Sequence, residues 1–268
     1  MSTSFIEVIE TAIKNGAKPE NISTCHNFYP ERYTAPSLEA INDINNYWKA
    51  KNIPVAIFIS SLVKGSHGPW PVSDGLPTIE EHRDMPIEIQ LKHCLALDNV
   101  DEIIIGNAYA SEDEFKAIDQ VMKQVYVDVP KNEAFGFLAD FIPHGMVKRV
   151  PFKIQLEEGI TELEKEILFN YPTHSDLGDC MNYMLRSRWT RMIYKGKEIP
   201  CRPCNKTHYT RGDVVIVNDN LVHYRGEIQI VLKDMKVDGQ RNLLGHIDES
   251  EIFILEHIKA KDIFTFVE

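Results

Sequence analysis

Apolar and polar positions alternate in blocks along the first half of the chain. Residues 55–60 (VAIFIS) are almost continuously apolar and residues 102–107 (EIIIGN) nearly so, which is typical of strands covered on both faces. A shorter strand is predicted within residues 21–30. Between these runs apolar residues recur at helical spacing, in segments that begin near residues 4, 37, 86 and 111. Repeated strand–helix units of this kind predict a parallel sheet.

Capping signals mark the starts of these helices. Ser4 with Glu7 and Ser111 with Glu114 have the spacing of a capping box. Ser37 can cap a further helix, and Pro86 opens the next one.

From about Pro151 the pattern changes. Residues 152–158 resemble a strand, residues 161–169 a short helix, and a second helix is predicted from Cys180 to Arg188. Alternating apolar positions then predict antiparallel strands joined by polar turns, in the segments 214–219, 226–235, 251–258 and 262–268.

The expected fold class is α/β, with a partial (βα)8-type barrel followed by a small β-barrel-like domain. Only three strand–helix units are clear, whereas a closed barrel needs eight, and the chain begins on a helix. We therefore expect residues 1–147 to form the closing part of a βα barrel and residues 148–268 to form the β-rich domain.

Composition narrows the classes of partner. The formal charge of −11 disfavours nucleic acid or an anionic membrane, because both need clustered Lys and Arg. No apolar run approaches the roughly 18 residues of a membrane span, and the N-terminus lacks the pattern of a secretory signal. Five scattered cysteines do not form a disulfide framework. These features predict a cytoplasmic protein.

Several segments of the chain resemble the 6-phospho-N-acetylmuramidase family, in the family's order and at compatible spacing. They are HNFYP (26–30), GLPTIEEHR (75–83), IIIGNAYAS (103–111), LRSRWTR (185–191) and RGDVVIVNDNLVHYRGEIQIVLKD (211–234). The resemblance implies an N-terminal βα barrel, a C-terminal cyclophilin-like domain and a cytoplasmic hydrolase of a phosphorylated disaccharide from peptidoglycan. Family members usually begin earlier, so roughly five of the eight barrel strands are expected to be absent here.

Polar side chains follow the first predicted strand. His26, Asn27 and Tyr29 come at its carboxyl end, which faces the active site in βα barrels. They can hydrogen-bond sugar hydroxyls, and Tyr29 can stack on a ring. The alternative is that His26 and Asn27 satisfy buried loop backbone.

The segment 75–83 is the densest group of candidates. Thr78 can cap a short helix with Glu81 in capping-box position, which leaves Glu80 free to face the cleft. The helix N-terminus, Arg83 and His82 can then hold a phosphate. The alternative is a capped surface helix with solvated charges.

Three further residues are candidate ligands. Asn107 follows another strand end, where barrels commonly bind phosphate, although the alternative is a plain turn before a helix. Arg186 and Arg191 can attract an anionic substrate, and the alternative for them is an ion pair between the domains.

Cys201 and Cys204 form a CxxC motif with His208 nearby. A structural zinc needs four ligands, and no second CxxC exists. We expect reduced thiols, no metal and no cofactor.

Glycoside hydrolysis normally uses two carboxyl groups. Glu80 is the catalytic candidate, with Asp74 as the second carboxyl group. The resemblance implies hydrolysis of 6-phospho-N-acetylmuramyl-N-acetylglucosamine or a related compound in the recycling of peptidoglycan.

The alternative is a truncated, non-catalytic phosphosugar-binding fragment, or a subunit that needs the missing barrel half. A third interpretation is that the second domain binds a peptide. The expected partner is a small phosphosugar, together with a second copy of the chain or a complementing barrel fragment.

Overall fold

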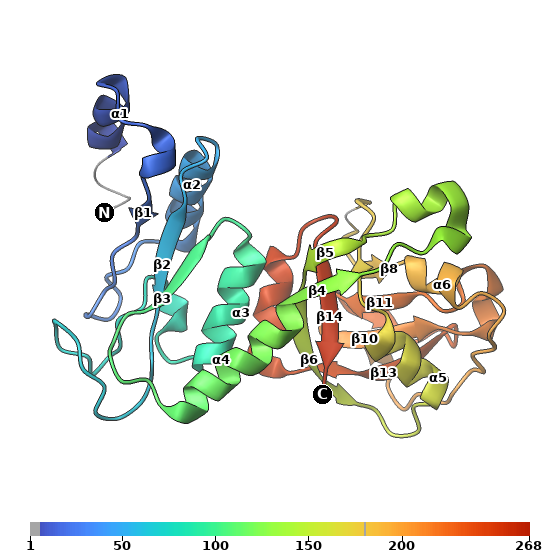
Figure 1. Ribbon diagram of the computed structural model, residues 1–268. Coiled ribbons are helices and arrows are strands. Elements are labelled where there is room, and N and C mark those ends of the chain that lie inside the picture. Colours follow the sequence, from blue (N-terminus) through green and yellow to red (C-terminus); the bar gives the residue numbers. More distant parts are fainter. Residues whose placement is uncertain (1–5, 180) are drawn as a thin grey trace. The chain divides into compact units, whose positions relative to one another are not determined.

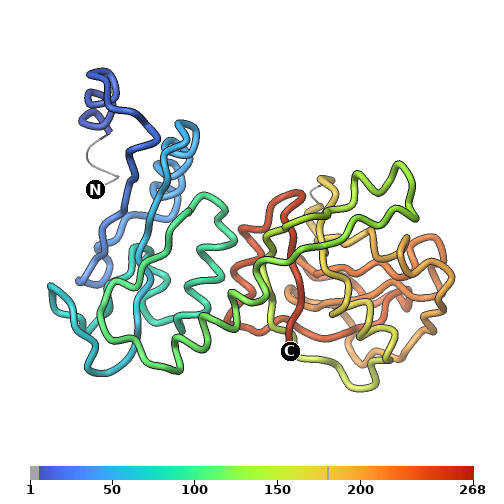
Figure 2. The backbone as a smooth tube through the Cα atoms, in the orientation of Figure 1, coloured from blue at the N-terminus to red at the C-terminus, as the bar shows by residue number. Residues whose placement is uncertain are grey.

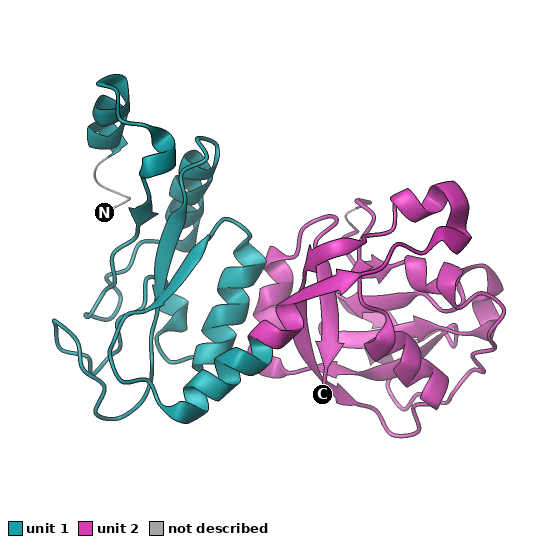
Figure 3. Ribbon diagram, viewed as in Figure 1, with its two compact units in different colours: residues 1–121 teal, residues 122–268 magenta. Residues whose placement is uncertain are grey.

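The computed structural model describes residues 6–179 and 181–268. The chain divides into two compact units, residues 1–121 and residues 122–268 (Figure 3). The predicted cap at Ser4 and the predicted helix start at Cys180 lie outside the described residues.

Unit 1 contains a three-stranded parallel sheet in the order β1-β2-β3 (Figure 1). Its elements are α1 (Ile6–Lys14), η1 (Pro19–Asn21), β1 (Thr24–Cys25), α2 (Leu38–Lys49), β2 (Val55–Ile59), η2 (Glu80–His82), α3 (Ile87–Leu97) and β3 (Glu102–Ile105), and α4 (Glu112–Val125) begins in it. The predicted parallel pairing of the three strands is confirmed.

Local signals explain why these helices begin where they do. The Ser37 hydroxyl accepts a hydrogen bond from the backbone N–H of Ala40, and α2 starts at the next residue. Ser111 and Glu114 exchange hydrogen bonds with each other's backbone N–H groups, so the predicted capping box is present. The buried face of α2 carries Ile41, which packs with strand residues in an apolar core.

The parallel arrangement places all three carboxyl strand ends at the same edge of the sheet. A long loop, residues 60–86, leaves that edge after β2 and returns to α3 (Figure 2). This loop positions the site described below.

Unit 2 is built on a seven-stranded sheet in the order β7-β14-β6-β13-β10-β11-β8. Its strands are β4 (Tyr126–Val129), β5 (Gly145–Lys148), β6 (Val150–Leu156), β7 (His174–Ser175), β8 (Met184–Ser187), β9 (His208–Tyr209), β10 (Asp213–Val217), β11 (Ile228–Val231), β12 (Met235–Lys236), β13 (Arg241–Ile247) and β14 (Ile263–Val267). Its helices are η3 (Glu133–Asp140), α5 (Glu162–Lys165), η4 (Glu166–Asn170), α6 (Trp189–Ile193), η5 (Asp219–Tyr224) and η6 (Glu249–His257). β4 pairs with β5 and β9 with β12 in separate two-stranded ribbons.

The two edge strands of the large sheet, β7 and β8, are joined by a side-chain hydrogen bond. Nδ1 of His174 lies 2.9 Å from the hydroxyl of Ser187. The sheet is therefore a nearly closed barrel. Its pairing is antiparallel except between β14 and β6, which run parallel.

Two sequence predictions in unit 2 were wrong. The predicted helix from Cys180 to Arg188 contains strand β8, which pairs with β11. The predicted strand at 251–258 is the 3₁₀ helix η6, because the Asp248 side chain accepts from the backbone N–H of Ser250 and begins a turn there. Among the described helices, none is long and apolar enough to cross a membrane.

Candidate functional site

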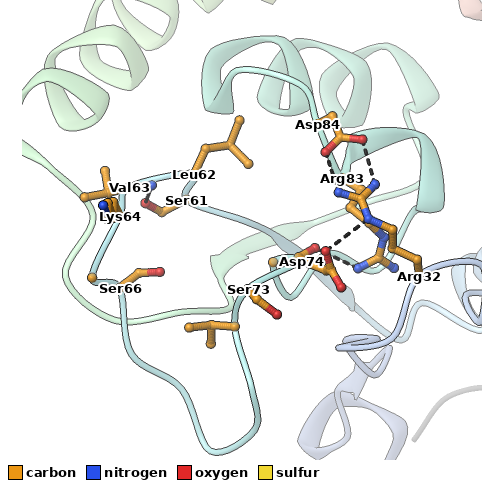
Figure 4. A pocket seen from close by; sticks show the side chains of 13 residues that line it. Arg32, Ser61, Leu62, Val63, Lys64, Ser66, Ser73, Asp74, Arg83 and Asp84 are labelled. Carbon is orange, nitrogen blue, oxygen red and sulfur yellow. Dashed lines mark hydrogen bonds and ion pairs between the residues drawn. The ribbon is translucent and has the colours of Figure 1, made fainter.

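A cavity of about 340 Å³ lies in unit 1 where the loop after β2 leaves the sheet. In Figure 4 the charged side chains of Arg32, Asp74 and Asp84 gather on one side, and Lys64 and Ser66 lie on the loop across from them. All the lining residues come from segments that follow the carboxyl ends of β1 and β2.

Arg83 is buried beneath this site and connects the loops that form it. Only 2% of its side chain is exposed. Its guanidinium forms a two-pronged ion pair with Glu80, at 2.6 and 2.8 Å. Its remaining N–H groups donate to the backbone carbonyls of Tyr29, Glu31 and Asp74. All five donors are used by the protein, so Arg83 joins the loops after β1 and β2 and has none left for a phosphate.

Glu80 is ionised at neutral pH. The Arg83 guanidinium and the backbone N–H groups of Tyr33 and Ala35 lower the pKa of the Glu80 carboxyl to about 2. A group with that pKa cannot donate a proton to a leaving group near pH 7. The two oxygens of Glu80 also already accept four hydrogen bonds, two from Arg83 and one each from the backbone N–H groups of Tyr33 and Ala35.

Arg32 bridges two carboxylates at the mouth of the cavity. Its guanidinium binds Asp84 with two hydrogen bonds of 2.8 Å and Asp74 with one of 3.0 Å (Figure 4). Arg32 lowers the pKa of the Asp84 carboxyl, which is exposed to solvent.

The cap predicted at Thr78 was wrong. The Thr78 hydroxyl donates to the carbonyl of Asn27 and accepts from the backbone N–H of Phe58. The 3₁₀ helix η2 has no side-chain cap and is only three residues long. Thr78 instead ties the end of β1 to β2.

The two predicted histidines are buried. His26 is 2% exposed and its Nε2 lies 2.6 Å from the side-chain oxygen of Asn45. His82 is 0% exposed and its Nε2 lies 2.8 Å from Nδ1 of His93. Burial lowers the pKa of both imidazoles, and the charge of His93 adds to the effect at His82.

Asn107 belongs to a buried polar network. Its amide accepts from the backbone N–H of Ser61 and donates to the Ser61 carbonyl and the Ser66 hydroxyl. Glu114 binds the hydroxyl of Ser61 from the start of α4. These bonds fix the first residues of the cavity loop. Asn27 is exposed, and Tyr29 is half-buried beside Arg83.

The arginines of unit 2 form an ion pair within that unit. Arg186 makes hydrogen bonds of 2.5 and 2.9 Å to Glu227, and a nitrogen of Arg191 lies 3.8 Å from the same carboxylate. Both guanidiniums lie over the ring of Tyr224.

The cysteines of the CxxC motif differ in environment. Cys201 is exposed, and its sulfur lies 3.4 Å from the carbonyl of Gly239. Cys204 packs beside Tyr209 in an apolar cluster. In the part of the chain that the structure describes, both thiols are free and no three His, Cys, Asp or Glu side chains are grouped as metal ligands.

Sequence reasoning missed Arg32, Lys64 and Asp84 as cavity residues. Lys64 is exposed and makes no ion pair with any described residue. A signal was present, because the Gly- and Pro-rich loop 61–77 directly follows a buried parallel strand.

Comparison with known proteins relates both parts of the chain to one family. Residues 1–120 match the family model for the N-terminal part of 6-phospho-N-acetylmuramidase. Residues 150–267 match the model for its C-terminal part. A comparison with curated proteins finds no match.

Two solved structures share the fold. An uncharacterised B. cereus protein is 34% identical, with a TM-score of 0.83 over 100% of this chain and 69% of that one. A conserved protein of unknown function from Enterococcus faecalis is 24% identical, with a TM-score of 0.60 over 99% of this chain and 64% of that one. The chain thus spans about two thirds of the length of each.

Proposed function

Because the chain belongs to the 6-phospho-N-acetylmuramidase family of glycoside hydrolases, we propose that it acts on a 6-phosphorylated amino-sugar disaccharide. The substrate is 6-phospho-N-acetylmuramyl-N-acetylglucosamine or a close relative, and the setting is the recovery of cell-wall sugars in the cytoplasm. In the same proposal residues 1–147 form the closing part of a (βα)8 barrel and residues 148–268 form a cyclophilin-like domain.

The cavity at the strand ends carries this proposal. Its volume of about 340 Å³ falls within the range of small-molecule sites, roughly 300–1,000 Å³. Lys64 brings an ammonium group without a protein partner among the described residues, and the Ser66 and Ser73 hydroxyls can bind sugar oxygens. We assign the sugar phosphate to Lys64, with Asn27 and Tyr29 at the adjoining strand end.

The charges of the cavity set the roles of the other residues. Arg83 and Glu80 are saturated by each other and by backbone groups, so they position the loops. Asn107, His26 and His82 support the same strand ends from inside the protein. Retaining and inverting glycosidases both need a protonated carboxyl group. Glu80, with its lowered pKa, does not supply one.

Because the Glu80 carboxyl is ionised and cannot act as the acid, a second candidate function is also favoured, that of a non-catalytic phosphosugar-binding subunit. In that case the chain binds the phosphosugar, and the acid comes from a complementing barrel fragment. The two functions share the binding step and differ in the cleavage step.

Calorimetry with N-acetylmuramic acid 6-phosphate and with unphosphorylated N-acetylmuramic acid tests the binding step. We expect only the phosphorylated sugar to bind. Lys64→Gln should weaken binding roughly 10- to 150-fold, since a hydrogen bond to a charged group contributes roughly 1.5–3 kcal/mol. Lys18→Gln is the control, because Lys18 carries the same charge but directly precedes η1 and does not line the cavity. Equal affinity for the two sugars would contradict the proposal.

Incubation of the phosphorylated disaccharide with the chain tests the cleavage step. Release of free N-acetylglucosamine supports the hydrolase. Binding without release supports the binding subunit.

A further inference from the structure

A cluster of charged and aromatic side chains in unit 2 has no part in the cavity of unit 1. The Arg191 cluster consists of Arg186 on β8, Arg191 on α6, Tyr224 at the end of η5 and Glu227 just before β11. β8 and β11 are neighbours in the sheet (Figure 1), and Arg186 stands opposite Gln229 across the pair.

The buried carboxylate of this cluster is satisfied without Arg191. Glu227 is 0% exposed. Arg186 binds both of its oxygens, and the side-chain amide of Gln229 donates to one of them at 2.8 Å. One carboxylate therefore faces two guanidiniums, and Arg186 already neutralises it. The positive charge of Arg191 is therefore not neutralised by a carboxylate of this cluster.

Arg191 is held in place although its donors remain open. Its guanidinium lies 5.2 Å from the centre of the Tyr224 ring, and Arg186 lies 5.5 Å from the same ring. Its nearest contact with Glu227, 3.8 Å, is longer than a hydrogen bond. Across residues 6–179 and 181–268, no hydrogen bond from this guanidinium to the protein is formed, and 29% of the side chain is exposed.

We propose that the Arg191 cluster binds an oxyanion, a carboxylate or phosphate monoester, carried by a small ligand. A guanidinium is a planar fork that matches two oxygens of such a group. Tyr224 and Glu227 fix the orientation of that fork before the ligand arrives, which reduces the entropy lost on binding. This proposal does not depend on the hydrolase assignment.

Titration of the full chain with inorganic phosphate and, separately, with D-lactate tests this proposal. NMR detection of the Arg191 Nε–H signal reports on the site itself. A saturable shift with phosphate, with lactate or with both supports the site and tells which oxyanion it prefers. The same titration of Lys64→Gln distinguishes the Arg191 cluster from the cavity of unit 1. The shift of the Arg191 signal should be unchanged in this variant, whether or not the cavity binds a phosphosugar.

Two variants and a control complete the experiment. Tyr224→Leu, at a position 40% exposed, should weaken the saturable binding severalfold by releasing Arg191. Any binding of phosphate or D-lactate that calorimetry still detects in Lys64→Gln should be lost when Arg191→Gln is added to that variant. Arg211→Gln should not change it, because it removes the same charge from an exposed pair with Glu256. Absence of a saturable Arg191 shift with both probes at tens of millimolar overturns the proposal, and so does binding that persists in Arg191→Gln.

Discussion

Arg83 shows how a charged residue can serve the architecture of a binding site without facing its ligand. Its chemistry, a fork of five donors, is that of a phosphate ligand. Its position is 2% exposed, with every donor turned to Glu80 or to backbone carbonyls of two loops. Arg32, on the surface of the same cavity, makes ion pairs of similar geometry with 36% of its side chain exposed. Burial, more than residue type, separates their roles.

The first prediction compares these two arginines. Arg83→Gln should lower the free energy of unfolding by about 3 kcal/mol, because it removes a buried charge and leaves carbonyls of Tyr29 and Asp74 without donors. Arg32→Gln should cost less than about 1 kcal/mol, as exposed ion pairs do. Urea denaturation measures both. Equal costs for the two variants would show that the buried bonds add nothing.

The second prediction concerns His174, which joins the edge strands of the unit 2 sheet. Its Nε2 donates to the carbonyl of Leu168, and in the neutral imidazole Nδ1 accepts from the hydroxyl of Ser187. Burial lowers the pKa of His174 from 6.5 to about 3. Above pH 6.5 the side chain is neutral in both states. Below it the unfolded chain binds a proton that the folded chain does not, so stability falls until pH reaches about 3.

Comparison with His174→Gln isolates this contribution. Between pH 6.5 and 4 the stability of the unsubstituted protein relative to the variant should fall by up to about 1.4 kcal/mol per pH unit. Urea denaturation across this range, followed by near-ultraviolet circular dichroism, measures it. A pH-independent difference would show that His174 is charged, or solvated, in the folded state.

At the level of elements, the two units differ in how far local sequence signals predict where helices and strands lie. Two helices of unit 1, α2 and α4, begin just after residues whose own side chains cap them, Ser37 and Ser111. In unit 2, β13 was missed because its sequence, RNLLGHI, interrupts its apolar positions with polar residues and a glycine. Its pairing with β10 contains a bulge at Leu244, where the register shifts by one residue.

The third prediction tests the glycine beside that bulge. A Cβ on Gly245 would collide with the carbonyl oxygen of Gln155 on the neighbouring strand β6. Gly245→Ala should therefore cost about 3 kcal/mol, or prevent unit 2 from folding. Gly159→Ala is the control, since Gly159 has a φ of +77° but open space around it, and it should cost about 1 kcal/mol. Thermal unfolding distinguishes them, and a Gly245 effect no larger than the control refutes the steric argument.

At the scale of the whole molecule, the two units differ in how their sheets end. In unit 2 the edges of the large sheet come together at His174 and Ser187. In unit 1, β1 and β3 each pair only with β2 among the described strands. Ile104 on β3 is 38% exposed. Open edges of this kind recruit further strands.

The fourth prediction is that this 268-residue chain self-associates through unit 1. Light scattering should show a mass that rises with concentration. Ile104→Lys should reduce the association, because a lysine on an edge strand opposes pairing with another chain. Tyr126→Lys is the control, as it replaces an exposed apolar residue in the β4–β5 ribbon of unit 2. A constant monomer mass up to high concentration would exclude the open edges as contact surfaces.

The sequence by itself determined that β1, β2 and β3 pair in parallel, where α2, α3, α4 and α5 begin, and the resemblance to the family. These depend on short apolar runs, on caps within three residues and on motifs such as GLPTIEEHR, all of which are local. Only the tertiary structure decided that Arg83 donates to the carbonyls of Tyr29 and Glu31, that His174 meets Ser187, and that β14 runs parallel to β6. These contacts join residues distant in the chain or on separate strands. Burial there fixes the protonation state and the partners of each side chain, and no local pattern encodes that burial.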